Sequence, residues 1–272
     1  MNNTEKRNPK STHIDKMPLK DALQLINEEN RRVSDAIDAA LPEIEEACLA
    51  MIESIAAGGR IFYIGAGTSG RLGVMDAAEC PPTYGVAKDL FVGVIAGGPN
   101  CMFTAAEAQE DDPQSARIDL AEKGLKRGDV VIGISASGGA AYVVGALSFA
   151  KEMGAAAIAI VNNPDTPMSR VAEITIVLDT GAEVITGSTR MKAGTAQKVV
   201  LNMLSTMALV RSGCVYENMM INLRPSNSKL RRRMIGITCE ILGCDADTAE
   251  KRLEAASWRI RDAVESKEGQ LK

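Results

Sequence analysis

Five short runs of apolar residues, separated by longer stretches with helical periodicity, constrain the fold of this chain most strongly. Each run is continuous rather than alternating, which is typical of strands buried on both faces of a sheet. The strand candidates are residues 60–65, 91–97, 129–135, 156–163 and 173–179. The helix candidates are residues 69–79, 102–110, 114–124, 141–153 and 191–212. This alternation predicts right-handed βαβ units in an α/β fold, namely a three-layer α/β/α sandwich with a five-stranded parallel sheet.

The sequence on either side of this core predicts helical extensions. Residues 1–17 are polar and predict an extended arm. Residues 18–57 have apolar residues at helical spacing, which indicates two helices divided near Pro42. Residues 226–266 are again rich in helix-forming sequence. We therefore expect three parts: an N-terminal arm with helices at 1–50, a sheet domain at 51–214 and a C-terminal helical region at 215–272.

Composition excludes several classes of partner. Aromatic residues make up only 3% of the chain, so the core must be built from Ala, Val, Ile, Leu and Met. The net charge is −4 and no stretch combines basic with aromatic residues, so we expect no nucleic-acid partner. The basic run at residues 229–233 predicts a solvated helix face or a local anion contact. No run reaches the roughly 18 apolar residues of a membrane span, so we expect no membrane partner.

Cysteine and histidine usage limits the available chemistry. The six cysteines form no CxxC pair and the N-terminus lacks the pattern of a signal peptide, so we expect a cytoplasmic protein with reduced thiols. The only histidine is His13, in the polar N-terminal segment. A Ser-His-Asp triad or a histidine-based zinc centre would need this residue inside the site. Acid–base work must then fall to Asp, Glu, Lys, Tyr or Cys.

A loop rich in glycine and hydroxyl groups joins the first strand candidate to the first helix candidate. Residues 65–70 read GAGTSG, which fits the dinucleotide-binding pattern G-x-G-x-x-G. That pattern also needs an acidic residue at the end of the second strand, and residues 91–97 end without one, which disfavours NAD. Gly67, Thr68 and Ser69 instead offer backbone N–H groups and hydroxyls at a helix start, which suits a phosphate. The alternative is a tight turn with an ordinary N-cap.

Two further loops have a similar character. An S-x-S-G loop follows the third strand candidate and contains Ser135, Ser137 and Gly138. A second loop precedes the helix candidate at residues 191–212 and contains Ser188, Thr189, Arg190 and Lys192. Cations at a helix start oppose the helix dipole, so a bound anion would explain Arg190 and Lys192. Exposure to solvent would explain them equally well, and the sequence leaves both interpretations open.

The order of these strands and loops resembles the sugar isomerase (SIS) domain, a flavodoxin-like fold that binds phosphosugars. Two segments are similar, more narrowly, to the N-acetylmuramic acid 6-phosphate etherase family: residues 64–85, IGAGTSGRLGVMDAAECPPTYG, and residues 181–198, GAEVITGSTRMKAGTAQK. Residues 201–206 and 222–230 share this resemblance. Glucokinase regulatory protein also shares the pattern of residues 181–198. The family usually continues the S-x-S-G loop with Arg-Thr-Pro, where this chain has Gly139-Ala140-Ala141.

The resemblance implies a lyase of cell-wall sugar recycling and catabolism. Such an enzyme cleaves the D-lactyl ether of N-acetylmuramic acid 6-phosphate by elimination and rehydration, to N-acetylglucosamine 6-phosphate and D-lactate. The resemblance further implies Glu79 as the proton donor, Glu110 as the base, and substrate binding by the three loops. It also implies a homodimer with its sites at the interface. The reaction needs no metal and no cofactor.

The positions of Glu79 and Glu110 give a separate reason to consider them. Both are expected at the C-terminal ends of helix candidates, where the negative end of the helix dipole disfavours ionisation. Glu107 would share a helical face with Glu110 and is a backup for it. The alternative for each is an ordinary solvated carboxylate.

Two other functions compete with the lyase. A non-catalytic phosphosugar sensor on the same fold would need no pair of carboxylates. An aldose–ketose isomerase would usually use a histidine for ring opening, and only His13 exists. The carboxylate pair therefore separates the lyase from the sensor.

Overall fold

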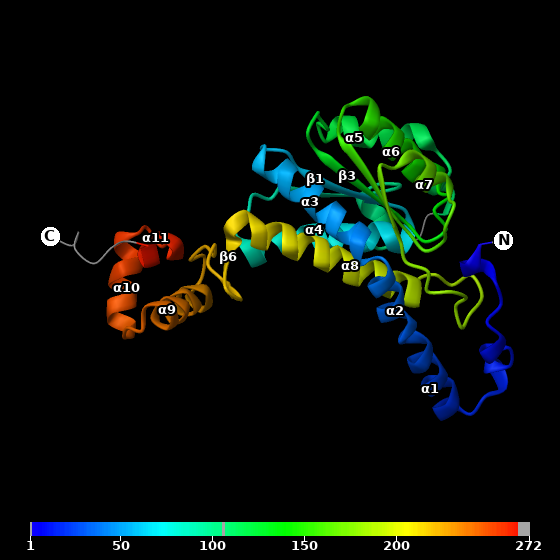
Figure 1. The fold of residues 1–272 in the computed structure, drawn as a ribbon, viewed down its shortest axis with the longest axis horizontal. Coiled ribbons are helices and arrows are strands. Elements are labelled where there is room, and N and C mark those ends of the chain that lie inside the picture. The colour runs from blue at the N-terminus through cyan, green and yellow to red at the C-terminus, as the bar shows by residue number, and fades with distance from the viewer. Residues whose placement is uncertain (1, 105–106, 266–272) are drawn as a thin grey trace. The chain divides into compact units, whose positions relative to one another are not determined.

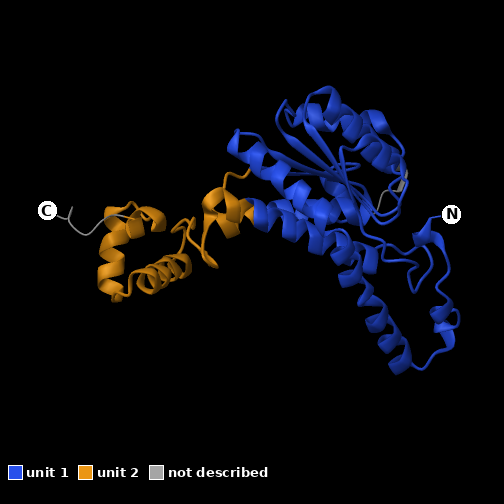
Figure 2. Ribbon diagram, in the orientation of Figure 1, with its two compact units in different colours: residues 1–78, 89–208 blue, residues 79–88, 209–272 orange. Residues whose placement is uncertain are grey.

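The computed structural model describes residues 2–104 and 107–265, and its chain divides into two compact units that are taken in turn. Unit 1 comprises Met1–Ala78 and Asp89–Ala208, and unit 2 comprises Glu79–Lys88 and Leu209–Lys272. Figure 2 gives each unit its own colour. Helix α4, Gly67–Tyr84, passes from unit 1 into unit 2.

Unit 1 is built around a parallel sheet of five strands in the order β2-β1-β3-β4-β5. The strands are β1 (Ile61–Gly65), β2 (Phe91–Ile95), β3 (Val130–Ser135), β4 (Ala156–Val161) and β5 (Ile174–Val177). Every neighbouring pair of strands is parallel. Ile64 of β1 lies opposite Val94 of β2 and Gly133 of β3. Each strand lies inside a range predicted from an apolar run, so the predicted parallel sheet is confirmed.

Helices cover both faces of this sheet, as Figure 1 shows. On one face lie α3 (Leu41–Ala56), α4 and α8 (Lys192–Leu209). On the other lie α5 (Pro113–Glu122), α6 (Ala141–Glu152) and α7 (Pro167–Val171). The α/β/α sandwich with helical extensions is therefore confirmed. None of the helices in the described part of the chain combines the length and the apolar character that a membrane crossing requires.

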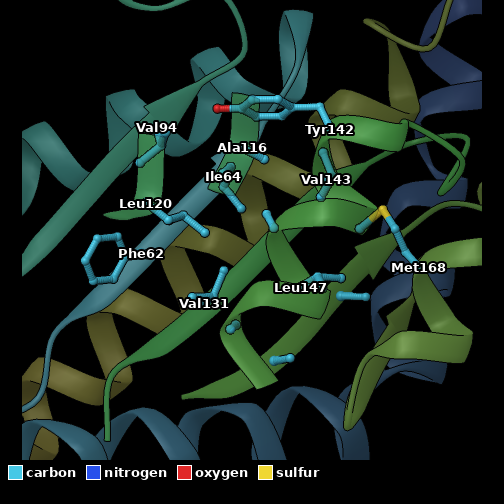
Figure 3. Close-up of a cluster of buried hydrophobic side chains, with 14 of the residues drawn as sticks. Phe62, Ile64, Val94, Ala116, Leu120, Val131, Tyr142, Val143, Leu147 and Met168 are labelled. Carbon is cyan, nitrogen blue, oxygen red and sulfur yellow. The ribbon is translucent and has the colours of Figure 1, made fainter. Parts of the chain in front are cut away.

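The face of the sheet beneath α5 and α6 carries a hydrophobic cluster, drawn in Figure 3. Its labelled members are Phe62, Ile64, Val94, Ala116, Leu120, Val131, Tyr142, Val143, Leu147 and Met168. On this face β3 carries Gly133, whose Cβ would lie 2.7 Å from the Val143 side chain, so α6 packs directly on the strand backbone. The buried Tyr142 hydroxyl donates to the Asp119 carboxylate at 2.5 Å, which satisfies the polar end of that ring.

The glycines of the 65–70 loop allow α4 to pack closely on β1. A Cβ on Gly70 would lie 2.5 Å from the carbonyl oxygen of Gly65, and one on Gly65 would lie 2.7 Å from the Gly70 nitrogen. Only residues without a side chain permit that approach. Two of the glycines in the G-x-G-x-x-G pattern are therefore explained by helix–strand packing, without a dinucleotide.

The N-terminal segment is not the extended arm that we predicted. It forms three short 3₁₀ turns, η1 (Asn3–Glu5), η2 (Pro9–Ser11) and η3 (Ile14–Lys16). Thr4, Asn8 and Ser11 are buried, because their polar groups find hydrogen-bond partners in unit 1 or within the segment. Polar composition alone does not distinguish such a docked segment from a solvated one.

The region between this segment and β1 contains three helices, where we predicted two. They are α1 (Leu19–Asn30), α2 (Arg32–Ala39) and α3, and Pro42 lies in the first turn of α3. Proline is favoured there because the first N–H groups of a helix lack partners in any case. The predicted break near Pro42 is present, and the additional break at Arg31 has no strong local signal.

The helix predicted at residues 102–110 is wrong in the described part of that range. The chain instead forms two 3₁₀ turns, η4 (Pro99–Met102) and η5 (Glu107–Glu110). The Arg71 guanidinium donates to the carbonyl oxygens of Met102 at 3.0 Å and Thr104 at 3.4 Å. An α-helix would use those carbonyls internally, so this tertiary contact favours the irregular backbone.

Helix α4 is longer than predicted, because it continues through Pro81 and Pro82 to Tyr84. The Gly85 N–H bonds the Pro81 carbonyl at 2.9 Å, and the Asn222 amide donates to the Tyr84 carbonyl at 2.7 Å. These bonds satisfy the end of the helix inside unit 2. Proline usually breaks a helix, and tertiary bonding outweighs that preference here.

Unit 2 contains a short hairpin and three helices with their own apolar cluster. The chain passes from the π-helical turn η6 (Val210–Cys214) into β6 (Val215–Tyr216) and β7 (Met219–Met220), then into α9 (Ser228–Leu242), α10 (Ala246–Ala255) and α11 (Ile260–Glu265). Met234, Leu253 and Ile260 are at the centre of the cluster. The basic side chains of residues 229–233 are exposed on α9, which is the first of the two alternatives predicted, and Arg231 stacks on the Trp258 ring at 4.3 Å.

The close approach of α4 to β1 predicts that Gly70→Ala destabilises unit 1. The added Cβ would meet backbone, which cannot rotate away, so we expect a loss of about 1–3 kcal/mol in the free energy of unfolding. Thermal and urea unfolding followed by circular dichroism measure this loss. Gly236→Ala is the matched control, because nothing lies within 4 Å of its added Cβ, and it should not destabilise. Equal effects of the two substitutions would contradict the packing argument.

Candidate active site

The loops that follow β1 and β3 enclose a pocket at the carboxyl ends of these strands. β1 and β3 are neighbours, but α4 leaves β1 toward one face of the sheet and α6 leaves β3 toward the other (Figure 1). The pocket therefore lies where the strand order reverses, which is the usual ligand site of such sheets. Its volume is about 300 Å³, enough for a small ligand. The described residues that line it are Glu5, Ala66, Gly67, Thr68, Ser69, Glu110, Ser135, Ala136, Ser137, Ala140 and Thr189.

Two helices begin at this pocket. α4 starts at Gly67, and α6 starts directly after Ala140, which provides no side-chain cap. The first N–H groups of an α-helix have no partner within the helix, and the helix dipole adds partial positive charge at the same place. The pocket therefore has the electrostatic character of a site for an anion such as phosphate.

The start of α8 is different, because the Glu183 carboxylate occupies it. The Ala193 N–H donates to Glu183 at 2.9 Å and the Lys192 N–H at 3.4 Å, while the Gly194 N–H donates to the Thr189 carbonyl at 2.9 Å. Burial raises the pKa of Glu183, although the backbone bonds and the Lys192 charge oppose it. α4 and α6 thus have more free donors for an anion than α8.

The serine hydroxyls of the S-x-S-G loop hold the loop in shape. Ser135 Oγ accepts the Gly138 N–H, and Ser137 Oγ accepts the Gly139 N–H, each at 3.2 Å. The two hydroxyls lie 3.3 Å apart, so one of them donates to the other and one proton remains for a ligand. Gly138 has a φ of 67° and a Cβ there would lie 2.5 Å from Thr166, so this turn requires glycine. Gly138 shapes the loop and is not itself a described lining residue.

A chain of amide groups orients the Ser69 hydroxyl. The Asn162 amide donates to the Leu178 carbonyl at 2.8 Å, which leaves the Asn162 oxygen to accept from Gln197 at 2.9 Å. The Gln197 oxygen is then the acceptor for the Ser69 hydroxyl, also at 2.9 Å. Ser69 therefore donates its proton to the protein, and toward a ligand this oxygen can accept a hydrogen bond. Thr68 also lines the pocket.

The two predicted glutamates lie in different surroundings. Glu110 is the last residue of η5 and lines the pocket. Glu79 is exposed and belongs to unit 2, and α4 contributes no described lining residue beyond Ser69. Neither residue ends an α-helix as expected, because α4 continues to Tyr84 and η5 is a single 3₁₀ turn. The side chain of Glu107 lies outside the described residues.

Glu5 is a pocket carboxylate that was not among the residues predicted from the sequence. It is the last residue of η1, in the segment predicted to be an extended, polar arm. No local signal marks it, because Thr4 and Glu5 form an ordinary polar pair in the sequence. Asn162 and Asn163, at the carboxyl end of a strand candidate, did carry a signal, since polar residues there face the ligand edge of a parallel sheet.

Among the described residues, no group of three or more His, Cys, Asp or Glu side chains is arranged to hold a metal ion.

The predicted residues of the 188–192 loop are dispersed. Thr189 lines the pocket, Ser188 is half-buried, and Arg190 is exposed. The Lys192 side chain is 1% exposed, and its Nζ lies 2.7 Å from the Glu29 carboxylate. Lys192 thus has a buried carboxylate as its partner, which is neither of the two environments that the sequence left open.

Glu29 is the centre of a buried polar cluster that joins the N-terminal segment to the start of α8. Its carboxylate accepts hydrogen bonds from Lys192 Nζ, from the Asn8 amide at 2.9 Å and from Lys10 Nζ at 3.1 Å. Burial by itself raises the pKa of Glu29, but the bonds and charges of Lys192, Lys10 and Arg32 outweigh it and lower the pKa to about 2. The cluster therefore fixes η2, α1 and the loop before α8 relative to one another within unit 1.

Two protein families match parts of the chain. "Glucokinase regulatory protein N-terminal SIS domain" matches residues 43–151, and "SIS domain" matches residues 120–207. Solved structures with the same fold include a phosphoheptose isomerase from Francisella tularensis, with a TM-score of 0.55 and 17% identity over 71% of this chain and 98% of that one. The C-terminal domain of glucosamine-fructose-6-phosphate aminotransferase from the same organism has a TM-score of 0.52 and 20% identity over 80% and 56%.

The sequence identity to two bacterial proteins is much higher than to these solved structures. An N-acetylmuramic acid 6-phosphate etherase of Edwardsiella ictaluri is 48% identical over 96% of this chain and 87% of its own length. An N-acetylmuramic acid 6-phosphate etherase of Oceanobacillus iheyensis is 47% identical over 96% of this chain and 89% of its own length. These matches span both units, because each leaves only a small part of the chain unmatched.

The Glu29 cluster predicts a pH-dependent contribution to stability. The pKa of this carboxyl is about 2 in the folded protein against 4.5 ordinarily, so its stabilisation is complete above about pH 4.5 and is lost as pH falls through about 2. We expect Glu29→Gln to lower the free energy of unfolding by about 3–5 kcal/mol at neutral pH. The difference from the unsubstituted protein should shrink as the pH of urea unfolding is lowered below 4.5.

Glu28→Gln is the matched control for that experiment, because the neighbouring Glu28 is exposed. It should change the free energy of unfolding by less than about 0.5 kcal/mol at each pH. A Glu29→Gln variant that is no less stable than Glu28→Gln would show that the buried cluster contributes nothing.

Proposed function

Because the chain belongs to the N-acetylmuramic acid 6-phosphate etherase family, we propose that it cleaves the D-lactyl ether of N-acetylmuramic acid 6-phosphate. The products are N-acetylglucosamine 6-phosphate and D-lactate, so the protein is a carbon–oxygen lyase of amino-sugar recycling. The observation that carries this proposal is a pocket in which two free helix starts, suited to a phosphate, lie with the Glu110 carboxylate.

Elimination is the route that the chemistry of this ether favours. Direct hydrolysis would expel a poor alkoxide leaving group. In the open-chain aldehyde, the carbonyl at carbon 1 acidifies the proton at carbon 2, so a base can remove it. The bond between carbon 3 and the lactyl oxygen then breaks as an acid protonates that oxygen. Water finally adds to the unsaturated aldehyde, with its hydroxyl at carbon 3 and a proton at carbon 2. Two side chains that exchange protons near neutral pH suffice for these steps.

The pocket residues support an assignment of roles. The N–H groups at the starts of α4 and α6, the Thr68 hydroxyl and the one free proton of the Ser135–Ser137 hydroxyl pair would bind the phosphate, because they can donate hydrogen bonds to it. Glu110 would act as the base, since it is the described lining carboxylate that the family resemblance assigns to this step. Glu79 would protonate the lactyl oxygen.

The assignment of Glu79 requires a homodimer. This residue is exposed on α4, and it is not one of the described lining residues of the pocket in its own chain. On α4 and α8, which are joined by a 2.7 Å hydrogen bond from Asn202 to Asp76, Met75 is 43% exposed and Met207 is 41% exposed. We infer that these helices pair across a two-fold axis and that each chain supplies Glu79 to the pocket of its partner.

The proposed substrate indicates the cellular compartment in which the protein works. A sugar phosphate is charged and does not cross a bilayer unaided, so an enzyme that consumes it works in the compartment that holds it. None of the six cysteines, all of which lie in the described part of the chain, forms a disulfide, in agreement with the reducing cytoplasm. With a net charge of −4, we propose no nucleic-acid partner.

The first test is release of D-lactate by the purified protein from N-acetylmuramic acid 6-phosphate in ¹⁸O-labelled water. We expect the label at carbon 3 of the sugar and unlabelled lactate, measured by mass spectrometry of both products. Glu110→Gln should lower kcat by about 10²–10⁴-fold, because it removes the base. Asp111→Asn is the control, since Asp111 is exposed and is not one of the described lining residues.

Two outcomes would contradict the proposal. Tight binding of the substrate without lactate release by the unsubstituted protein would identify a phosphosugar sensor. Label in the lactate rather than the sugar would mean that water attacks the lactyl side and that no elimination occurs.

The second test is complementation between two inactive variants. Glu79→Ala and Glu110→Ala should each lack activity as pure proteins. If each pocket takes Glu79 from the partner subunit, mixing equal amounts after exchange of subunits should restore roughly a quarter of the original activity, because half of the dimers are mixed and each has one intact site. Analytical ultracentrifugation would verify the dimer. A dimer that shows no restored activity would mean that each chain uses its own Glu79.

A further inference from the structure

The first residues of the chain form a docked segment next to the pocket, which we call the N-terminal strap, residues 2–5. Thr4 is fully buried, its N–H donates to the Asn163 side chain at 3.2 Å, and the Asn163 amide donates to the Thr4 hydroxyl at 2.9 Å. The Asn3 amide donates to the Asp179 carboxylate at 2.8 Å. Asn163 and Asp179 follow β4 and β5, so the strap is anchored at the same edge of the sheet as the pocket.

This anchoring brings the Glu5 side chain to the pocket. Glu5 is a lining residue, and its carboxylate lies beside Gly187, where a Cβ would be 3.3 Å from Glu5 Oε2. Within residues 2–104 and 107–265, the structure gives this carboxylate no ion pair and no hydrogen bond. A carboxylate held at a pocket without a protein partner retains its full capacity to accept hydrogen bonds from a ligand.

The chemistry of the pocket limits what Glu5 can bind. An ionised carboxylate accepts hydrogen bonds and repels a phosphate, whereas the helix starts and hydroxyls of the same pocket donate hydrogen bonds and attract one. The group that faces Glu5 must therefore be a neutral donor, such as a hydroxyl or an amide N–H of the sugar. Ser69, whose proton is directed at Gln197, can accept from such a group as well.

We propose that Glu5 is a specificity-determining residue that accepts hydrogen bonds from hydroxyl or amide N–H groups of the sugar. Its negative charge disfavours ligands that are only anions, so the pocket selects a phosphosugar over inorganic phosphate. The proposal rests on the phosphosugar ligand of the proposed function and does not depend on cleavage of that ligand.

The test compares the binding of two probes, N-acetylglucosamine 6-phosphate and inorganic phosphate, by isothermal titration calorimetry. Glu5→Ala should weaken binding of the sugar phosphate by about 10- to 100-fold, as loss of a hydrogen bond to a charged group does. Its affinity for inorganic phosphate should stay constant or increase. Glu5→Gln preserves size and should weaken the sugar phosphate less than Glu5→Ala. Asp15→Ala, an exposed acid in the same N-terminal segment, is the control and should change neither affinity.

Three outcomes would overturn the proposal. Equal weakening of both probes would show that Glu5 only maintains the strap. Strengthening of both would show simple charge repulsion, and no change in either would show that Glu5 does not contact the ligand. These measurements are independent of lactate release, so an inactive protein with the expected binding pattern would contradict the proposed function and still support the role of Glu5.

Discussion

The site depends on the parallel pairing of β1 with β3. The two strands are neighbours in the sheet, yet the helices that follow them, α4 and α6, cover opposite faces. The loops that follow the two strands must therefore diverge at the carboxyl ends of these strands, and the space between these loops is the pocket. The same geometry directs two helix starts toward this space. Binding of an anion thus follows from backbone architecture before any particular side chain is considered.

The remaining parts of the pocket come from distant parts of the sequence, and the buried cluster around Glu29 holds them. Glu29 bonds Asn8 and Lys10, which follow the strap, and also Lys192 at the start of α8. The segment that follows the strap and the start of α8 are thereby both bonded to α1. Loss of any partner would leave a buried charge without compensation and would destabilise the fold. The cluster therefore imposes one arrangement on segments that have little apolar surface of their own.

The sequence predicts the strands well and the edges of the site poorly, for physical reasons. A strand buried on both faces must be continuously apolar, so each of the five apolar runs contained a strand. The irregular segments follow from tertiary bonds that leave no local pattern. Arg71 binds carbonyls that a helix at residues 102–110 would have used, and Asn222 supports a helix end beyond Pro82. The sequence left open whether Lys192 binds an anion or is exposed, because its partner, Glu29, is 163 residues away in the sequence.

The phosphate site and the carboxylates of the pocket also differ in how they depend on the sequence. The proposed phosphate donors at α4 and α6 are backbone groups, and any sequence that keeps the sheet and its glycines retains them. The carboxylates of the pocket, Glu5 and Glu110, end the single 3₁₀ turns η1 and η5, which contribute little to the core. Substitution on such turns changes the chemistry of the pocket without disturbing the sheet. The fold shared with a phosphoheptose isomerase at 17% identity is consistent with this arrangement, since conserving the scaffold requires few conserved side chains.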